Sequence, residues 1–379
     1  MSLKVLEFIK NNENWREILS NPPYCLIIKD DNLYNINYTL LQYDLRKSDV
    51  SLNIVQESRG LIFETDTLRP VCFPFYKFFN YAEENAHKID WNTARVYEKL
   101  DGSLISVWNN NSKKENEWII STSGTINADN AICGNSELYK DSGIILYSFE
   151  QLFLSTLYYE CQFSYDEFFD FLNKDYCYMF ELMSPETRIV VPHEKPKLRH
   201  IATRNMKTLQ ELEIDIGIEK PREYNFYSLE DVIETAKILS YNDEGFVICD
   251  KNYNRIKIKS PEYVQIHHMR DFFTDKGIIE IIKNNEIDEV LTYFPEFKNK
   301  VKDIQNKINK IASELDKDIS LEIKKYIRKD LAEYAKSKKY PHLIFQYYDN
   351  KVHNAEEWIW SNKTKRILNI LKDAKNDTI

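Results

Sequence analysis

The stretch Tyr97-Glu98-Lys99-Leu100-Asp101-Gly102-Ser103-Leu104 places one lysine between two strand-like runs. Apolar residues precede the lysine at Ala94 and Val96, and a second run follows over residues 104–108. The Asp-Gly pair predicts a tight turn, so we expect a hairpin that fixes the direction of Lys99 beside backbone N–H groups. This placement suits a nucleophile directed at a phosphate. The pattern Lys-x-Asp-Gly alone fits an ordinary surface hairpin equally well.

A lysine nucleophile has to be uncharged. An unperturbed lysine has a pKa of about 10.4, so it is almost wholly protonated at neutral pH and cannot attack. Removing the proton at pH 7.4 costs about 4 kcal/mol unless the surroundings lower the pKa. Burial, neighbouring cations and a bound metal ion all do so. We therefore expect other positive charges close to Lys99.

Length and composition limit the class of protein. A chain of 379 residues predicts two domains. The six cysteines form no Cys-x-x-Cys pair, which favours reduced thiols over disulfides or a zinc site. The sequence contains neither an apolar run of roughly 20 residues nor a signal-peptide pattern at its start, so we expect a cytoplasmic protein without membrane contact (host cytoplasm, if viral).

Charge is distributed unevenly along the chain. The net charge of −9 argues against a protein that coats nucleic acid through bulk charge. From Glu262 onward, however, 22 basic residues face 20 acidic ones, so the acidic excess lies in the preceding part. Local phosphate contacts remain compatible with this balance.

Periodicity predicts an α+β body followed by an all-helical region. Residues 3–19 show the stripe of an amphipathic helix, and short strands are expected over 25–29, 34–41, 117–122, 176–182 and 187–191. The pattern 228–239 is helical again. After Ser260 the chain reads as nearly all helix, with an apolar stripe from Val301 to Leu315. We place the domains at 1–261 and 262–379.

Several charged residues stand in strand-like or turn positions. Arg59 precedes Gly60, Lys77 lies in an aromatic run, and Glu181 interrupts the apolar run 176–182. A charge in a strand core is costly unless it is paired, so Glu181 should have a defined partner. Glu244 opens a strand, and in the run Arg255-Ile256-Lys257-Ile258-Lys259 the two lysines share one face. That face is either simply solvated or a phosphate site.

The order of these residues resembles that of the covalent nucleotidyltransferase superfamily. A more specific resemblance is to the phage-type RNA ligase 1 family. It rests on Glu57-Ser58-Arg59-Gly60, Lys77-Phe78-Phe79-Asn80, Glu98 to Leu104, Phe180 to Val190, and Glu244 to Tyr263. The resemblance implies an ATP-grasp-like nucleotidyltransferase domain of antiparallel sheets flanked by helices over 1–261. It also implies an all-α C-terminal domain over 262–379 that binds RNA.

The resemblance implies a three-step ligation of RNA. Lys99 attacks the α-phosphorus of ATP and expels pyrophosphate. The AMP passes to an RNA 5′-phosphate, and an RNA 3′-hydroxyl then displaces it. ATP and Mg²⁺ are the implied cofactors, with Mn²⁺ as an alternative metal. RNA ends are the implied partners, foremost those of nicked tRNA, and a monomer is the simplest assembly.

The resemblance also assigns roles to residues. Lys257 and Lys259 would neutralise the α-phosphate and help to lower the pKa of Lys99. Glu244 would hold the metal ion through water, and Glu181 would accept hydrogen bonds from the ribose. The remaining implied contacts to ATP or metal are Arg59, Lys77, Gly102, Tyr43, Ser123 and Asp288. Ser123 stands where the family often has a basic residue, so it brings no charge to that contact.

Two other interpretations are open. A DNA ligase or a capping guanylyltransferase would share the motifs and would bring GTP into question, but both usually carry an OB-type barrel where this chain has helices. A non-catalytic RNA-binding protein on a ligase scaffold is the second. The charged motif residues are present apart from the position of Ser123, which argues against loss of activity.

Overall fold

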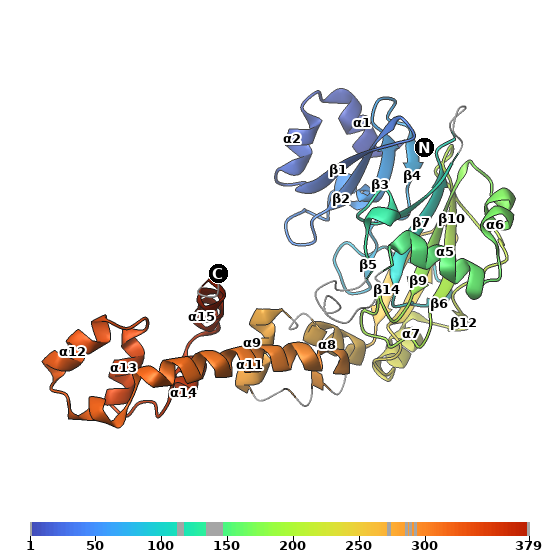
Figure 1. Cartoon of the computed structure of the whole chain (residues 1–379). Coiled ribbons are helices and arrows are strands. Elements are labelled where there is room, and N and C mark those ends of the chain that lie inside the picture. Colours follow the sequence, from blue (N-terminus) through green and yellow to red (C-terminus); the bar gives the residue numbers. More distant parts are fainter. Residues whose placement is uncertain are drawn as a thin grey trace. The chain divides into compact units, whose positions relative to one another are not determined.

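The computed structural model describes residues 2–111, 117–133, 147–270, 274–284 and 294–376, together with residues 287, 290 and 291. The chain divides into two compact units, Met1–Gln265 and Ile266–Ile379. Within the described part of the chain, every helix is too short or too polar to cross a lipid bilayer. The class is α+β, with sheets in the first unit and helices in the second (Figure 1).

The first unit contains three sheets. In order across each sheet, the strands are β1-β2-β3-β4, then β11-β10-β9-β7-β8, then β12-β6-β13-β14-β5. All pairs are antiparallel except β14 with β5. The strands are β1 (Leu26–Leu33), β2 (Ile36–Tyr43), β3 (Arg59–Glu64), β4 (Pro70–Cys72), β5 (Phe79–Asn80), β6 (Arg95–Glu98), β7 (Ser103–Asn109), β8 (Trp118–Thr122), β9 (Tyr176–Met183), β10 (Lys197–Asn205), β11 (Glu211–Leu212), β12 (Glu223–Tyr224), β13 (Gly245–Cys249) and β14 (Arg255–Lys259).

Helices flank these sheets and fill the second unit. Those up to the unit boundary are α1 (Lys4–Asn11), α2 (Trp15–Ser20), α3 (Asn53–Glu57), α5 (Phe149–Tyr159), α6 (Tyr165–Phe171), α7 (Leu229–Lys237) and α8 (Pro261–Arg270). The later ones are α9 (Asp275–Asn284), α11 (Lys298–Leu315), α12 (Arg328–Lys336), α13 (Pro341–Tyr348), α14 (Ala355–Ser361) and α15 (Thr364–Asn376).

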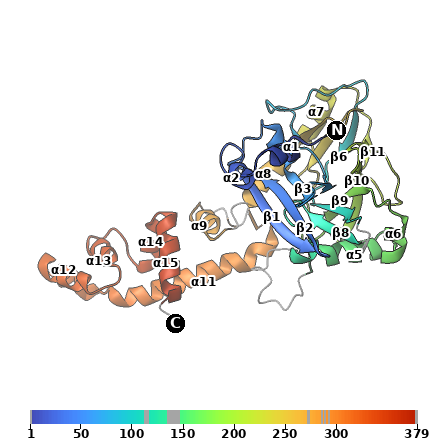
Figure 2. The same cartoon turned by 90° about the horizontal axis from the view of Figure 1, so that it is seen from above.

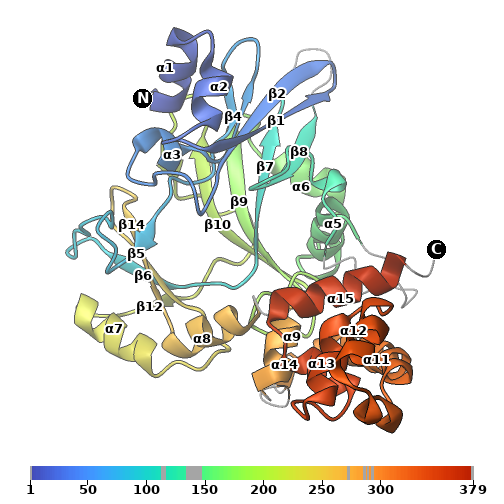
Figure 3. The same cartoon turned by 90° about the vertical axis from the view of Figure 1, so that its left-hand side faces the viewer.

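Each sheet of the first unit has its own apolar packing. Helices α1 and α2 lie beside the sheet of β1–β4 (Figure 2), where Leu6, Leu19 and Phe63 share one core. Helices α5 and α6 lie beside the sheet that contains β7 and β8 (Figure 3), and Phe153 and Phe180 share the core there. Helix α7 packs on β13 and β14 through Val232. The sheet of β1–β4 and the sheet that contains β7–β9 also share a core, in which the rings of Tyr38 and Trp108 lie 5.2 Å apart.

The expected hairpin around Lys99 is wrong. Strands β6 and β7 belong to different sheets, so residues 99–102 cross from one sheet to another. The backbone N–H of Lys99 donates to the carbonyl of Gly245 on β13 (2.8 Å) and not to the following strand. Lys99 is therefore fixed at the junction of two sheets, a placement that neighbouring sequence alone does not encode.

Other local expectations are corrected as well. The stripe over 3–19 forms two helices, α1 and α2, because the polar residues 12–14 between them form a turn. Residues 187–191 form no strand, since the N–H groups of Val190 and Val191 donate to the carboxylate of Asp101 (2.8 and 2.7 Å). Those donors are used by a side chain, so no β ladder can form on them.

In the second unit, α11 is the central helix. Its residues Val301, Ile304, Ile308, Ile311 and Leu315 are buried, as the apolar stripe predicts. This face packs against α9, α14 and α15. The stripe is thus used for the unit's own core.

Candidate active site

A buried carboxylate joins two lysines where β13 begins and β14 ends. Oε2 of Glu244 lies 2.7 Å from Nζ of Lys99, and Oε1 lies 2.7 Å from Nζ of Lys259. The Glu244 side chain is 4% exposed. Burial alone would raise the pKa of Glu244, but the charges of Lys99 and Lys259 and their hydrogen bonds outweigh it and lower that pKa. The three groups form one charged cluster.

The antiparallel register of β13 and β14 creates this cluster. Gly245 pairs with Lys259 and Val247 with Lys257, so Glu244 at the start of β13 faces the end of β14. Gly245 has a φ of +134°, and a Cβ there would lie 2.0 Å from the carbonyl oxygen of Ile258. Only glycine allows the two strands to approach so closely at this point.

Lys257 is the lysine whose protonation is most disturbed. Burial and, after it, the nearby positive charges of Lys99, Lys259, Lys77 and Arg59 together lower its pKa to about 8. Positive charge was expected close to Lys99, and Lys259 shares the carboxylate of Glu244 with it. The direct partner of Lys99, however, is the carboxylate of Glu244 and not a cation.

Aromatic rings hold the remaining cations. Nζ of Lys77 lies 5.4 Å from the ring centroid of Tyr43 and 4.8 Å from that of Phe79. The guanidinium of Arg59 lies 5.2 Å from the ring of Phe78, whose other neighbour is Lys257 at 6.0 Å. Nη1 of Arg59 is buried without a hydrogen-bond partner among the described residues. An unpaired buried guanidinium nitrogen is a donor that an anionic ligand could satisfy.

Glu181 is a second carboxylate of the site. Burial raises its pKa to about 7, Lys99 opposes the rise, and Glu244 adds to it. No described residue donates a hydrogen bond to its carboxylate, so the defined protein partner that we expected is not found. Gly102 lies against Glu181, because a Cβ at 102 would be 2.7 Å from the carbonyl of Leu182 and 3.0 Å from Cγ of Glu181. Because Gly102 has no side chain, strand β9 can approach the chain closely at this residue.

Asp101 has a larger structural role than turn formation. Oδ2 accepts the N–H groups of Val190 and Val191, and Oδ1 accepts the hydroxyl of Tyr263 (2.8 Å). The Tyr263 ring lies 5.0 Å from Nζ of Lys259. Asp101 thus connects the Lys99 segment, the loop before β10 and helix α8. Sequence reasoning missed this connection, since the partners are 89 to 162 residues away.

Ser123 lies beside the Arg59 segment. A Cβ on Gly60 would be 3.1 Å from Cα of Ser123. The next residue, Gly124, accepts a hydrogen bond from Nζ of Lys29 at 2.6 Å. The ammonium group of Lys29, on β1, therefore reaches the segment of Ser123 and Gly124. The sequence around Lys29 does not indicate this contact. Asp288, the remaining expected residue, lies outside the described residues.

The two carboxylates suit a hydrated divalent cation. The described residues contain no group of three or more His, Cys, Asp or Glu side chains that could hold a metal alone. Magnesium commonly binds through one or two carboxylates, with waters and substrate phosphates completing its shell. Glu181, which is partly exposed and has no hydrogen-bond donor among the described residues, and Glu244, which is buried, fit such an ion.

Comparison with known proteins gives a family match over much of the first unit. A family model described as RNA ligase matches residues 57–263. Autographa californica nuclear polyhedrosis virus has a protein, named as a bifunctional polynucleotide kinase/RNA ligase, that is 30% identical over 290 residues, covering 73% of this chain and 40% of that protein. An RNA ligase of Rhodothermus phage RM378 is 25% identical over 297 residues, covering 62% of this chain and 65% of that protein. The chain thus spans less than two thirds of either relative.

Solved structures give weaker similarities. An archaeal ATP-dependent RNA ligase aligns with a TM-score of 0.40 and 12% identity, covering 72% of this chain and 67% of that chain. A mutant of the Naegleria gruberi RNA ligase with ATP and Mn aligns with a TM-score of 0.32 and 12% identity, covering 46% of this chain and 52% of that chain.

Proposed function

Because this chain belongs to the phage-type RNA ligase 1 family, we propose that it is an ATP-dependent RNA ligase that works through a covalent AMP on Lys99. One observation carries the proposal: Glu244 links Lys99 to Lys259, with Lys257 on the same strand as Lys259. An amine, a buried carboxylate and further cations are the groups that nucleotidyl transfer to lysine requires.

In the first step, Nζ of Lys99 forms a bond to the α-phosphorus of ATP. The bond from that phosphorus to the bridging oxygen breaks, pyrophosphate leaves with the electron pair, and the amine loses its proton. Lys99 held in an ion pair with Glu244 cannot attack, so the incoming nucleotide must release this pair. Lys257, Lys259 and Arg59 then face the negative charge that accumulates on the phosphoryl oxygens.

Residues around the nucleophile would bind the rest of ATP. Arg59, with its unpaired Nη1, and Lys77, held between two aromatic rings, are donors for the triphosphate. Lys29, which lies against Gly124, is a further cation near the Ser123 segment. Glu181 is the acceptor for a ribose hydroxyl or for metal-bound water. Tyr43 offers an aromatic face.

Glu244 and Glu181 would hold Mg²⁺ or Mn²⁺, and a bound ion would offset phosphate charge and favour the neutral form of Lys99. The chain's own part is to keep Glu244 ionised in a buried place, which the two lysines accomplish. Glu244, which is paired with Lys99 in this structure, would be one of the residues that hold the ion when it is bound.

The AMP then moves to RNA. An oxygen of the RNA 5′-phosphate attacks the AMP phosphorus, the N–P bond breaks, and Lys99 recovers a proton. Finally a 3′-hydroxyl attacks the activated 5′-phosphate, its proton is lost, and AMP leaves as a phosphodiester forms. Lys257 and Lys259 are suited to stabilise the charge in all three steps, because each step passes through a pentavalent phosphorus.

We extend the proposal to the substrate. Nicked tRNA is the RNA that the resemblance of the chain to its family suggests, with the helical unit as the part that binds the tRNA body. From Glu262 onward the chain has 22 basic and 20 acidic residues, whereas the preceding part has an acidic excess. This difference supports RNA binding by the helical unit. We further propose that a monomer is sufficient, since the residues assigned here come from one chain.

RNA joining tests the proposal. We would incubate the protein with ATP, Mg²⁺ and RNA bearing a 5′-phosphate and a 3′-hydroxyl, and follow protection of the phosphate from phosphatase. We expect protection with ATP, none without ATP, and loss in Lys99→Ala. Preference for GTP would favour a capping-type enzyme, and RNA binding without protection would favour a non-catalytic protein.

A further inference from the structure

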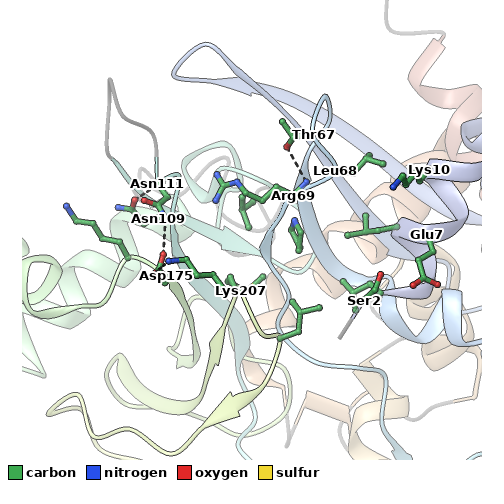
Figure 4. Close-up of a pocket in the computed structure, with 17 residues that line it drawn as sticks. Ser2, Glu7, Lys10, Thr67, Leu68, Arg69, Asn109, Asn111, Asp175 and Lys207 are labelled. Atoms are coloured by element: carbon green, nitrogen blue, oxygen red, sulfur yellow. Dashed lines mark hydrogen bonds and ion pairs between the residues drawn. The ribbon is translucent and has the colours of Figure 1, made fainter.

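A pocket lies at the end of the first unit's sheets away from Lys99. Its walls are one side of α1 with the residues before it, the β3–β4 turn with the start of β4, the end of β7, the residues before β9 and the β10–β11 turn (Figure 4). Its volume is about 880 Å³, within the range of sites for small molecules and cofactors. Strand β7 runs from Ser103, beside the nucleophile segment, to Asn109 in this pocket, a length of roughly 20 Å. The pocket is therefore separate from the ATP site.

One wall of the pocket is apolar. Leu3, Leu6, Val71 and Leu209 are buried lining residues, and Met206 lies beside them. Flat apolar groups such as a nucleobase pack well on a surface of this kind, because burying them removes apolar area from water.

The other wall contains a donor without a partner. Asn109 is 3% exposed, and its Nδ2 has no hydrogen-bond partner within the described part of the chain. Its Oδ1 accepts the N–H of Asn111 at 2.7 Å, which fixes the orientation of the amide. A buried amide donor without an acceptor is costly, and a ligand oxygen would satisfy it.

The charge of the pocket is positive. It is lined by four basic residues, Lys10, Arg69, Lys174 and Lys207, and by two acidic residues, Glu7 and Asp175. Lys207 and Asn111 satisfy Asp175 at 2.6 and 3.0 Å, and Arg69 is paired with Glu64. Lys10 and Lys174 are exposed and have no ion pair among the described residues. In a chain with a net charge of −9, a pocket of this sign points to an anionic ligand.

We propose that this pocket binds a nucleotide, with its base against the apolar wall and its phosphate beside Asn109, in the positive field to which Lys10 and Lys174 contribute from the pocket's lining. The nucleotide is either a residue of the RNA strand or a free nucleoside monophosphate. A stacked strand advances about 3.4 Å per nucleotide, so an RNA residue here would lie on the order of six nucleotides from the ends being joined. If the nucleotide is a residue of an RNA strand, the inference rests on the ligase activity proposed above. The affinity of the pocket for nucleotides in general does not rest on it.

Charge reversal of the two unpaired lysines tests the proposal. The pocket variant is Lys10→Glu/Lys174→Glu. The matched control is Lys88→Glu/Lys220→Glu, which changes two other exposed lysines and gives the same net charge. A third variant, Asn109→Asp, keeps the acceptor for Asn111 but replaces the unpaired donor with an anionic oxygen. Thermal unfolding and adenylylation are measured for each, and we expect the two lysine variants to match the wild type in both.

The first arm uses single-stranded RNA of about 12 nucleotides with a 5′-hydroxyl, without ATP. The second uses AMP and protein that has already been adenylylated, so that the active site is filled. We expect the pocket variant and Asn109→Asp to weaken binding by about tenfold or more in one arm, and the control by less than about twofold. The arm that responds identifies the source of the nucleotide.

Equal binding by the pocket variant and the control in both arms would overturn the proposal. Failure of the ligase proposal would look different. In that case the wild-type protein would not be adenylylated, while the RNA arm would still report on the pocket.

Discussion

Lys99 and Glu244 are 145 residues apart in the sequence and 2.7 Å apart in the structure. The ion pair joins the crossover after β6 to the start of β13, and the second oxygen of Glu244 is bonded to Lys259. In the proposed mechanism, Lys99 can attack only after its ion pair with Glu244 has been released. The account therefore makes Glu244 the residue that couples binding of ATP and metal to activation of Lys99.

Replacing Glu244 by Gln should separate these roles. The amide keeps the size of the side chain but leaves the two partly exposed ammonium groups of Lys99 and Lys259 without their counter-charge. We expect lysine adenylylation to fall by about 10² or more and the free energy of unfolding to fall by roughly 1–3 kcal/mol. Urea denaturation and labelling with α-labelled ATP measure the two effects.

The exposed pair of Glu234 and Lys237, 2.6 Å apart, provides the control. Glu234→Gln should change the free energy of unfolding by less than about 0.5 kcal/mol and leave adenylylation unchanged. Similar losses in both variants would show that Glu244 has no special place in the reaction.

Binding of ATP should depend on the proton of Lys257. The pKa of Lys257 is lowered to about 8, so the cation is lost as the pH rises from 7 to 9. We expect the Kd of a non-reacting ATP analogue to increase by up to about tenfold between pH 7 and pH 9. In Lys257→Arg the charge persists, and the Kd should stay nearly constant. Calorimetric titration at each pH checks this. A flat profile for the wild type would contradict the role of Lys257.

Gly102→Ala should displace β9 from β7. The new methyl group would lie 2.7 Å from the carbonyl oxygen of Leu182. This distance is too short for a normal contact, so the backbone would have to move. We expect a destabilisation of about 1–3 kcal/mol together with weaker ATP binding, because Glu181 lies next to the shifted carbonyl. Urea denaturation measures the loss of stability, and titration with a non-reacting ATP analogue measures the loss of binding. Gly124→Ala, whose Cβ would meet the side chain of Gln42 at 3.3 Å, is the milder comparison. If Gly102→Ala had the stability and the ATP-analogue affinity of the wild type, the close packing of Gly102 against β9 would be contradicted.

His200 should make the protein sensitive to acid. Burial lowers the pKa of His200 to about 4, below the ordinary value of 6.5. Its contribution to stability is therefore complete above pH 6.5 and is lost as the pH falls toward 4. Between pH 7 and pH 4.5 this amounts to about 2.5 kcal/mol. His200→Asn should reduce the loss in unfolding free energy over that interval by a similar amount. An identical loss in both proteins would exclude His200 as the cause.

The sequence predicted the elements that depend on local pattern. Alternation gave β14 with Lys257 and Lys259 on one face, and the apolar period of α11 gave its buried stripe. The motif order also led to the family whose model matches residues 57–263. These features are encoded within a few neighbouring residues.

What the sequence did not predict depends on partners far along the chain. The hairpin at Lys99 was wrong because strand pairing is decided by β13, whose Gly245 accepts the N–H of Lys99. The expected strand at 187–191 fails because Asp101 takes its N–H groups. The contact of Lys29 with Gly124 spans 95 residues. A single sequence carries no local sign of such contacts.

The covalent step is tested most directly by peptide mapping. The protein is incubated with ATP and Mg²⁺, denatured, digested, and examined by mass spectrometry for a peptide that has gained one AMP. The account predicts one modified peptide, with the AMP on Lys99, and none in Lys99→Arg. AMP on another lysine, or an unmodified Lys99 in protein that still joins RNA, would contradict the central claim.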